Sequence, residues 1–521
     1  MIKNLSRRDF MMYGLLATGT LALSGAPGCA IQKKHVPDYD QDTPFILTHV
    51  NVVDVISGQV TPDAHVIIDS IGKIISMGQG PVELSPGHRV IDMKGRYLTP
   101  GLIDAHCHST VSPVFAMRMA DLVKHARQQK MNYVNTINSG VTTIRDMGAF
   151  TGMLRWFMRD IEKGRLPGPR VVYCNSILNV KGSHPEIPPS DVNFFARPAS
   201  VFMGMMMSNF KGPDQLAYYL EENARGASFI KLTLDNKTIF CKKDPTLPVY
   251  STKELDTIFG YAEKKGLPVV GHHHYVFGFD RAMEYPFHSI EHVVSDQYLS
   301  DAQVQRMADR KVAIVPTLTI AQSYLMEEAF DGIPAELKSD WVDDELKVRR
   351  HYFDMEAGNH CEPSLHAQNL AMLDNYKRYK QSSLFEHKKF LVNPELYFGM
   401  VNKGFANLKK MKDAGVLIGC GIDAGMPLNY FGGLYREFEI FQRLGFTSLE
   451  ILQCATINNA KILKMDDSIG SLDPGKWADM VAFDDNPLRD VQVLRNPAMV
   501  FKQGQLMYSS RDLSGESAFS S

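Results

Sequence analysis

The chain has 521 residues, enough for one large enzyme domain with an accessory domain. Its 44% hydrophobic and 22% charged residues are ordinary for a globular protein, and a net charge of -2 provides no electrostatic footprint for nucleic acid. No segment reaches the roughly 20 consecutive apolar residues that a membrane-spanning helix requires. These values exclude a nucleic-acid-binding protein and leave the enzyme and binding-protein classes open.

The first 29 residues are typical of an export signal rather than of folded structure. Ser6-Arg7-Arg8-Asp9-Phe10 has the twin-arginine pattern, and an uncharged run of mostly apolar or small residues follows it. Ala26-Pro-Gly-Cys29 partly resembles a lipoprotein cleavage box, although its proline fits poorly. We expect residues 1–29 to direct export by the twin-arginine route, to the periplasm or the cell surface. Lipidation of Cys29, the only membrane contact expected, is left open.

The remaining six cysteines lack the close, regular spacing of a disulfide framework. Several of them fall in apolar, strand-like runs, where a buried free thiol is the expected state. An oxidising compartment would still permit a disulfide bond, and the sequence does not pair the six residues, which are Cys107, Cys174, Cys241, Cys361, Cys420 and Cys454.

Short β-rich runs alternate with Gly and Pro turns between residues 45 and 97. Similar runs recur near the C-terminus, in residues 470–483 and 497–502. We therefore expect residues 41–97 and 468–512 to pair into one small β-sandwich domain beside the middle of the chain.

Strand and helix patterns alternate from residue 98 to residue 467, which favours a parallel α/β architecture. The first helix is expected over residues 116–138. Eight β/α units in about 370 residues fit a (β/α)8 TIM barrel, whose chemistry lies at the carboxyl ends of its strands. The first strand lies within residues 98–107, and the others are expected over residues 140–146, 170–175, 229–233, 267–272, 289–292, 312–316 and 416–423.

The gap between the seventh and eighth expected strands is wide. Residues 323–393 are charged, aromatic and helix-like. Three roles are open for this insertion: a lid over the barrel mouth, a contact in a homo-oligomer, or a surface elaboration without function.

Two histidines one residue apart end the first barrel strand, in Leu98-Thr-Pro-Gly-Leu-Ile-Asp-Ala-His-Cys-His-Ser109. Side chains alternate along a strand, so His106 and His108 share one face and Cys107 points the opposite way. Two imidazoles on one face can bind a single cation. An isolated pair of this kind is more often incidental, so the interpretation depends on further donors.

Such donors stand at the ends of later strands. Lys231 lies in an apolar setting on the fourth strand, where a bare ammonium is costly. His272 to His274 end the fifth strand, where the first and third histidines share a face, and His292 ends the sixth. Asp423 ends the eighth strand, although an aspartate there could equally cap a helix. Together these residues predict a metal centre.

The same residues resemble the amidohydrolase superfamily, in particular its branch of imidazolonepropionase-like enzymes and metal-dependent prolidases. The resemblance covers about residues 45–504 and rests on the His-x-His pair, the strand-4 lysine, the strand-5 and strand-6 histidines and Gly421-Ile-Asp-Ala-Gly425. It implies a metal-ligand set of His106, His108, Lys231, His272, His292 and Asp423.

The resemblance also implies individual roles. Lys231 is expected to carry a carbamate formed from carbon dioxide, and Asp423 to act as the metal-bound general base. His274 is left facing the substrate, and it is our candidate donor to the oxyanion. His184 follows the third strand where relatives carry Gly-Gly-His, and Tyr275 stands where relatives have glycine, so both are expected to contact the substrate. These departures mean that no relative's substrate transfers directly to this chain.

Four imidazoles, a carbamate and a carboxylate favour two zinc ions over manganese, cobalt or iron. We expect an exported enzyme that cleaves an amide or peptide C–N bond by attack of a metal-bridging hydroxide, with Asp423 passing a proton to the leaving nitrogen. Dipeptides and N-acyl amino acids are the leading small-molecule substrates. The alternative is a cyclic-amide hydrolase or a mononuclear deaminase-like enzyme. A non-catalytic binding protein on the same fold is the third possibility.

Overall fold

The computed structural model describes most of the chain from residue 43 to residue 511. The twin-arginine pattern, Cys29 and Cys241 lie outside the described residues, which are 43–81, 89–114, 121–186, 204, 206–239, 246–330, 332–374 and 393–511. Within these ranges no helix combines the length and the apolarity needed to cross a membrane. The same ranges hold buried free thiols at Cys107, Cys174, Cys361, Cys420 and Cys454.

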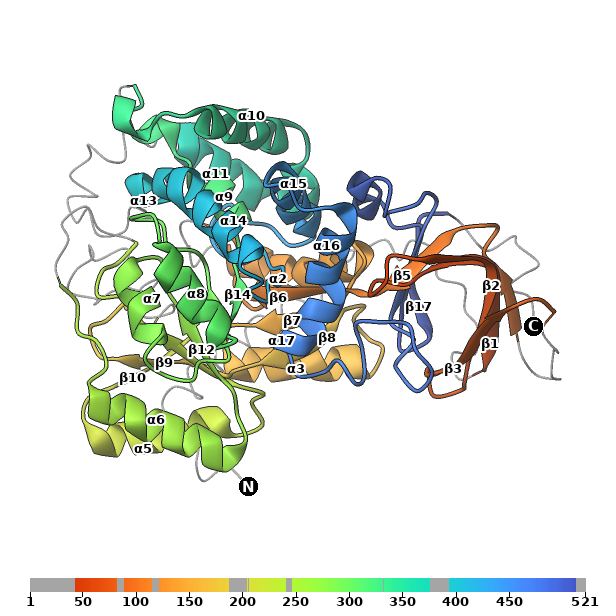
Figure 1. Cartoon of the computed structure of the whole chain (residues 1–521), viewed down its shortest axis with the longest axis horizontal. Helices are drawn as coiled ribbons and strands as arrows, with labels where there is room; N and C mark the ends of the chain where they lie inside the picture. The colour runs from red at the N-terminus through yellow and green to blue at the C-terminus, as the bar shows by residue number, and fades with distance from the viewer. Residues whose placement is uncertain are drawn as a thin grey trace.

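Strands from both ends of the chain form one eight-stranded sheet at one end of the molecule (Figure 1). Its order is β17-β16-β15-β5-β1-β2-β3 with β4 on β1, and the two chain ends meet where β5 runs antiparallel to β15. Side chains such as Leu47, Val66 and Phe501 fill a core of its own. A β-rich domain built from both termini is thus confirmed, although β5 carries the sheet past residue 97 to Pro100. The strands are β1 Phe45–Val53, β2 Val60–Ile68, β3 Ile74–Gln79, β4 Arg89–Asp92, β5 Tyr97–Pro100, β15 Met480–Phe483, β16 Met499–Lys502 and β17 Gln505–Ser509.

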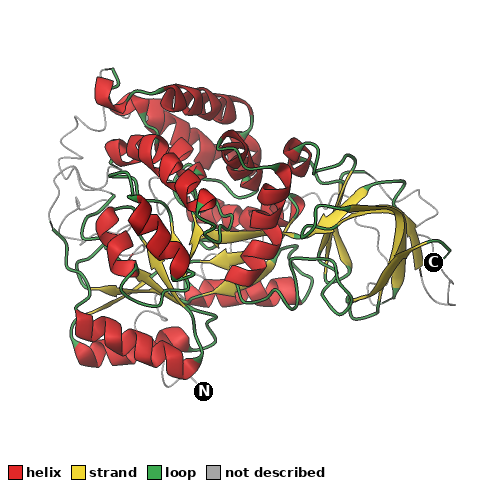
Figure 2. Ribbon diagram, viewed as in Figure 1, coloured by secondary structure: helices red, strands yellow, loops and turns green. Residues whose placement is uncertain are grey.

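The middle of the chain forms a barrel of parallel strands with helices around it, as the sequence predicts (Figure 2). One ladder comprises β6, β7 and β8, and a second comprises β11 to β14, extended beyond β11 by β9 and β10. The Ser228 amide donates to the Tyr173 carbonyl at 2.9 Å and joins the two ladders. The strands are β6 Leu102–Cys107, β7 Val141–Asp146, β8 Arg170–Tyr173, β9 Ile177–Val180, β10 Met207–Phe210, β11 Ile230–Thr233, β12 Val269–His272, β13 Ser289–Glu291 and β14 Ala313–Val315.

The eighth expected strand, residues 416–423, closes the barrel without forming a regular ladder, which corrects the prediction of a full strand there. Its Leu417 carbonyl accepts a hydrogen bond from β14 at 3.0 Å, and its Cys420 carbonyl accepts one from β6 at 2.9 Å. The Asn459 side chain supplies the missing pairing. It accepts from the Cys420 amide at 3.0 Å and donates to a β6 carbonyl at 2.6 Å. Because a side-chain amide bonds the backbone here, the groups are satisfied without a ladder.

Helix α6 begins and ends at residues with matching capping chemistry. The Ser251 hydroxyl accepts from the Glu254 amide, and the Glu254 carboxylate accepts from the Ser251 amide, at the start of α6. Gly266 ends α6 with a φ of 66°. The expected helix over residues 116–138 is described from Leu122 onward. The helices are α2 Leu122–Asn138, α3 Thr151–Glu162, α5 Pro213–Ala224, α6 Thr252–Lys265, α7 Val276–Ala282, α8 Asp301–Asp309, α14 Phe405–Asp413, α15 Leu434–Arg443, α16 Ser448–Gln453 and α17 Asn459–Ile462, with single turns at Met400–Gly404, Cys454–Asn458 and Val491–Arg495.

The segment between β14 and the eighth strand contains the insertion expected at residues 323–393, and its described helices pack on the barrel (Figure 1). Buried hydrogen bonds hold these helices in place. Glu437 of α15 accepts the amides of Leu318 and Thr319 at 2.8 and 2.7 Å, and Gln322 donates to Glu345 at 2.6 Å. The described helices are α9 Thr319–Tyr324, α10 Asp340–Met355, α11 Pro363–Asp374 and α13 Pro394–Gly399, with short turns at Glu327–Ala329, Ala335–Leu337 and Ala357–His360.

Candidate metal centre

Two imidazoles from the end of β6 face one carboxylate from the eighth strand. His106 and His108 lie on the same side of the chain, and Nε2 of each is 3.4 Å from Oδ1 of Asp423. All three residues are buried. Asp423 has a φ of 55°, in the left-handed region that a non-glycine residue adopts only at some cost, and its amide donates to the His106 carbonyl at 2.8 Å. This conformation turns the carboxylate toward β6.

Hydrogen bonds at the opposite ring nitrogens leave both Nε2 atoms with a lone pair. His108 Nδ1 is 2.8 Å from the Gly148 carbonyl oxygen, and His106 Nδ1 is 2.8 Å from Oε2 of Glu291. Carbonyl and carboxylate oxygens only accept, so each Nδ1 carries the proton. Burial lowers the pKa of His106 to about 3, and its ring is therefore neutral at pH 7. A neutral imidazole with an unprotonated Nε2 is the form that binds a metal ion.

Three further imidazoles gather beside this pair. Donor nitrogens of His272, His274 and His292 lie within 4.8 Å of one another, and so do donor atoms of His106, His292 and Asp423. His292 belongs to both groups, with ring centroids 4.5 Å from His272 and 4.3 Å from His274. The carboxyl ends of β6, β12 and β13 and the eighth strand thus bring two adjoining groups of ligand-type atoms together.

Lys231 reaches the same place from β11, the neighbour of β12. Its side chain is buried, and Nζ has no hydrogen-bond partner among the described residues. Burial lowers the pKa of Lys231 to about 8, so this amine gives up its proton more readily than an ordinary lysine. Buried polar groups are nearly always hydrogen-bonded, and an amine without an acceptor therefore requires an explanation.

Burial disfavours the charged forms of these side chains. Burial raises the pKa of Asp423 well above its ordinary value, although Lys231 lowers it, and burial lowers the pKa of His272, His274 and His292. Atoms without a hydrogen bond from the described residues remain at Asp423 Oδ1, His272 Nε2 and His274 Nδ1. Nitrogen and oxygen donors with available lone pairs suit a divalent transition metal, so the residues present fit one.

The buried ion pair of Arg145 and Glu291 orients the His106 ring through its Nδ1 atom. Besides accepting from His106, Glu291 accepts from Arg145 Nη2 at 2.7 Å and from the Ser289 hydroxyl at 2.8 Å. Burial opposes ionisation of Glu291, but the Arg145 charge and the His106 hydrogen bond outweigh it and lower the pKa to about 2. Glu291 and His292 both reach the centre although neighbours on a strand face opposite sides. The φ of 73° at His292 reverses the direction of its side chain.

The residues expected to contact substrate lie at the edge of this centre. The His184 ring stacks on that of His272 at 4.9 Å between centroids. Asp235, which follows β11, accepts the amides of His274 and Tyr275 at 2.7 and 3.3 Å. The Asp235 carboxylate therefore fixes the turn that carries both His274 and Tyr275.

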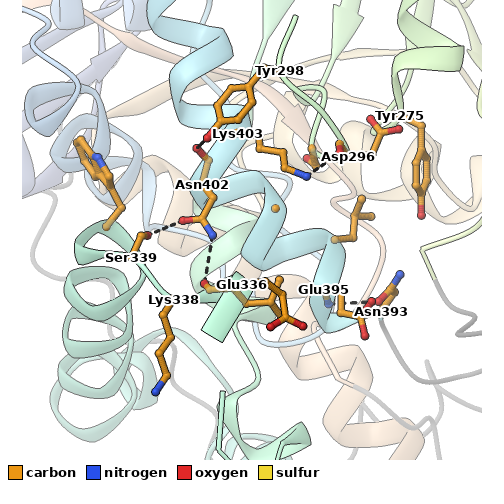
Figure 3. Close-up of a pocket in the computed structure, with 15 residues that line it drawn as sticks. Tyr275, Asp296, Tyr298, Glu336, Lys338, Ser339, Asn393, Glu395, Asn402 and Lys403 are labelled. Atoms are coloured by element: carbon orange, nitrogen blue, oxygen red, sulfur yellow. Dashed lines mark hydrogen bonds between the residues drawn. The ribbon is translucent and has the colours of Figure 1, made fainter. Parts of the chain in front are cut away.

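Tyr275 also lines a pocket of about 660 Å³ beside the centre (Figure 3). The pocket lies between the segment after β13, the start of α10 and the helices that follow residue 393. Lys403 donates to the Asp296 backbone carbonyl at 2.7 Å across it, and Asn402 bonds to Ser339. Tyr275 thus links this polar pocket with the turn that carries His274.

The sequence signature of the Amidohydrolase family matches residues 97–507. The chain belongs to the amidohydrolase family. Ochratoxinase of Aspergillus niger is 22% identical over 435 residues, which cover 78% of this chain and 75% of the relative. The structure of a Xaa-Pro dipeptidase with bound methionine has a TM-score of 0.66 at 22% identity and covers 90% of this chain and 100% of that chain. The structure of molinate hydrolase has a TM-score of 0.64 at 18% identity, and the match covers 89% of this chain and 94% of that chain.

Membership of the family confirms the predicted enzyme class: this amidohydrolase is a hydrolase that acts on carbon–nitrogen bonds. The structural likenesses, all below 25% identity, confirm the fold. Amidohydrolases are generally metal-dependent, which agrees with the ligand-type side chains gathered at the carboxyl ends of the strands.

Sequence reasoning missed several residues that position this amidohydrolase centre. Arg145 stands in β7 and Glu291 in β13, both strands with every residue buried, and Asp235 follows a similar strand. A charge within an otherwise buried strand needs a partner, which is a signal that the sequence carries. The identity of each partner is not encoded locally, because Arg145 and Glu291 are far apart in the chain.

Glu291→Gln should weaken metal binding roughly 10- to 100-fold, because an uncharged amide holds the His106 proton less firmly. It should also lower the free energy of unfolding by roughly 3–5 kcal/mol, since Arg145 keeps a buried charge without its counterion. Metal competition with a chelator and denaturant unfolding measure the two effects. The matched control is Glu284→Gln, an exposed partner of Arg281, which should change neither. An unaltered metal affinity in Glu291→Gln would contradict the orienting role.

Proposed function

We propose that this amidohydrolase is a binuclear metal enzyme that cleaves the amide bond of a dipeptide or an N-acyl amino acid. The observation that carries the proposal is Lys231, a buried amine that has a pKa of about 8 and no hydrogen-bond partner among the described residues, beside two adjoining groups of ligand-type side chains. A Xaa-Pro dipeptidase among the similar structures and an ochratoxinase among the relatives support small amides as substrates.

The chain's own donors would hold two divalent ions, for which zinc is our choice. The neutral Nζ of Lys231 would add to the carbon of carbon dioxide, forming an N–C bond and releasing one proton. The resulting carbamate would offer two oxygen atoms as metal ligands. When bound, the ions would lower the pKa of a coordinated water toward neutrality and polarise the scissile carbonyl. The other ligands in this proposal are Asp423, His106, His108, His272 and His292.

Asp423 is the proton carrier in this proposal. Its Oδ atom takes the proton of the attacking water and later delivers it to the leaving nitrogen, which must be protonated before the C–N bond breaks. His274 donates to the carbonyl oxygen as negative charge develops there, and His184 and Tyr275 contact the rest of the substrate. The turn held by Asp235 keeps His274 in place through its backbone amide.

A hydrolysis screen with zinc-loaded protein tests the proposal. Dipeptides, N-acyl amino acids and cyclic amides are assayed for release of amine, and metal is counted in the same sample. We expect hydrolysis in one of the first two classes with about two metals per chain. One metal per chain, with turnover of a cyclic amide or release of ammonia, would replace the proposal by the mononuclear alternative. Full metal loading without any turnover would favour a binding protein.

We also propose that the protein is exported through the twin-arginine route, on the pattern at Arg7 and Arg8. Replacing both residues with lysine should trap the protein in the cytoplasm, because that route recognises the guanidinium pair. Cell fractionation followed by immunoblotting measures the distribution, with Lys3→Arg as the control that keeps the pair intact. Normal periplasmic or surface levels of the double variant would indicate the general secretory route instead.

A further inference from the structure

A tyrosine just after the 323–393 insertion lies against the histidine cluster. Tyr397 belongs to α13, and its ring centroid is 5.9 Å from that of His274 and 4.8 Å from that of Tyr324 in α9. Its side chain is fully buried, and its hydroxyl has no hydrogen-bond partner among the described residues. Neither helix was expected to contribute to the centre, since both lie outside the strand ends that the sequence indicates.

Close backbone packing fixes the position of this phenol. A Cβ on Gly399 would collide with the Ser295 carbonyl oxygen, so α13 lies directly on the segment that follows β13. The Ser295 amide in turn donates to the His274 carbonyl at 2.8 Å. The other side of α13 lines the pocket of Figure 3 through Leu396 and Glu395. The helix therefore forms a wall with the pocket on one side and Tyr397 against the histidines on the other.

Packing alone does not account for the Tyr397 hydroxyl. A buried hydroxyl that makes no hydrogen bond loses its contacts with water and gains none in return, so phenylalanine would fill this space at lower cost. Burial raises the pKa of Tyr397 above its ordinary value, and Tyr324 and Asp423 add to the shift, so the phenol keeps its proton at neutral pH. A protonated phenol next to a reaction centre is a hydrogen-bond donor in need of an acceptor.

We propose that the Tyr397 hydroxyl donates a hydrogen bond to the substrate oxygen that becomes negatively charged when water adds to the amide carbonyl. The inference rests on the proposed amide hydrolysis and adds to it a residue from outside the barrel strands. The donor is in place before substrate arrives, and its benefit is greatest when the oxygen carries most charge, which is how a preorganised donor lowers a barrier. Helix α13, which follows the insertion, is then part of the active site.

Tyr397→Phe, compared with wild type, tests the assignment in zinc-loaded protein. We expect kcat to fall roughly 100-fold while KM changes less than about threefold, the pattern of a contact made mainly in the transition state. Metal content should be unchanged and Tm should not fall, because the missing oxygen bonded to no described residue. The matched control is Tyr352→Phe, which removes the hydroxyl of a buried tyrosine in α10. The Tyr352 ring centroid lies 3.8 Å from the Arg436 guanidinium carbon, and this variant should keep full turnover.

A second readout separates this inference from the proposed function. Methylphosphonate is a small tetrahedral anion, and calorimetry can measure its binding to zinc-loaded protein without turnover. Binding should be roughly tenfold weaker in Tyr397→Phe than in wild type or in Tyr352→Phe. If wild type hydrolyses no amide in the screen but this difference remains, the proposed function fails and the donor role stands. Equal phosphonate affinity and equal kcat in Tyr397→Phe, or loss of metal from it, would overturn the assignment.

Discussion

Asp423→Asn should reduce kcat by roughly 10³-fold or more while leaving the fold and most of the bound metal in place. The carboxylate must accept a proton and release it within one turnover, and a carboxamide does neither. Its Oδ1 lies 3.4 Å from Nε2 of both His106 and His108, where no other described carboxylate approaches both rings. Because burial raises the pKa of Asp423, the neutral amide should also leave the metal-free protein at least as stable as wild type.

Steady-state kinetics, metal analysis and thermal unfolding of Asp423→Asn measure these effects together. The control is Asp484→Asn, which removes an exposed carboxylate paired with Arg96 and should behave as wild type. Loss of a general base should cost roughly 10²- to 10⁴-fold in rate. A variant that retained more than about a tenth of the wild-type rate would therefore remove Asp423 from proton transfer.

Lys231→Ala should lose most of the bound metal and with it the activity. An unmodified ammonium beside four imidazole ligands would repel both ions, whereas a carbamate removes that charge and adds two oxygens. Alanine supplies no ligand, so metal affinity should fall well beyond the roughly 10- to 100-fold expected for an orienting residue. Acetate or propionate should partly restore both metal and activity by filling the vacated space. Metal analysis with and without these acids measures the recovery.

Lys502 is a matched control for this chemistry. Burial lowers its pKa to about 8 as well, but its Nζ donates to the Gly168 carbonyl at 2.7 Å, far in the chain from the histidines. Native intact-mass and crystallographic data at neutral pH should therefore find a carboxyl group on Lys231 and none on Lys502. An unmodified Lys231 in active, fully metallated enzyme would contradict the bridged two-metal proposal and leave the mononuclear one.

Strand periodicity predicted which of the candidate donors share a face, while the family resemblance implied the full ligand set. Residues two apart on a strand share a face, and the rings of His106 and His108 indeed lie 5.7 Å apart. The same reasoning applies to His272 and His274, whose centroids are 5.0 Å apart. Parallel strands in a barrel end at one rim, so ligand-type residues at strand ends converge whatever their separation in sequence. Local patterns therefore predicted the fold class, the β-rich domain and the place of the centre.

Other features arise only when distant segments meet. Glu291 and His292 reach one centre because a left-handed residue interrupts the alternation of β13. Asn459 replaces the ladder of the eighth strand, which periodicity had predicted to be regular. Tyr397 reaches His274 only because α13 rests on the chain at Ser295. Each depends on close contact between atoms that are far apart along the chain, and such contacts exist only after the barrel closes, so no local pattern of residues encodes them.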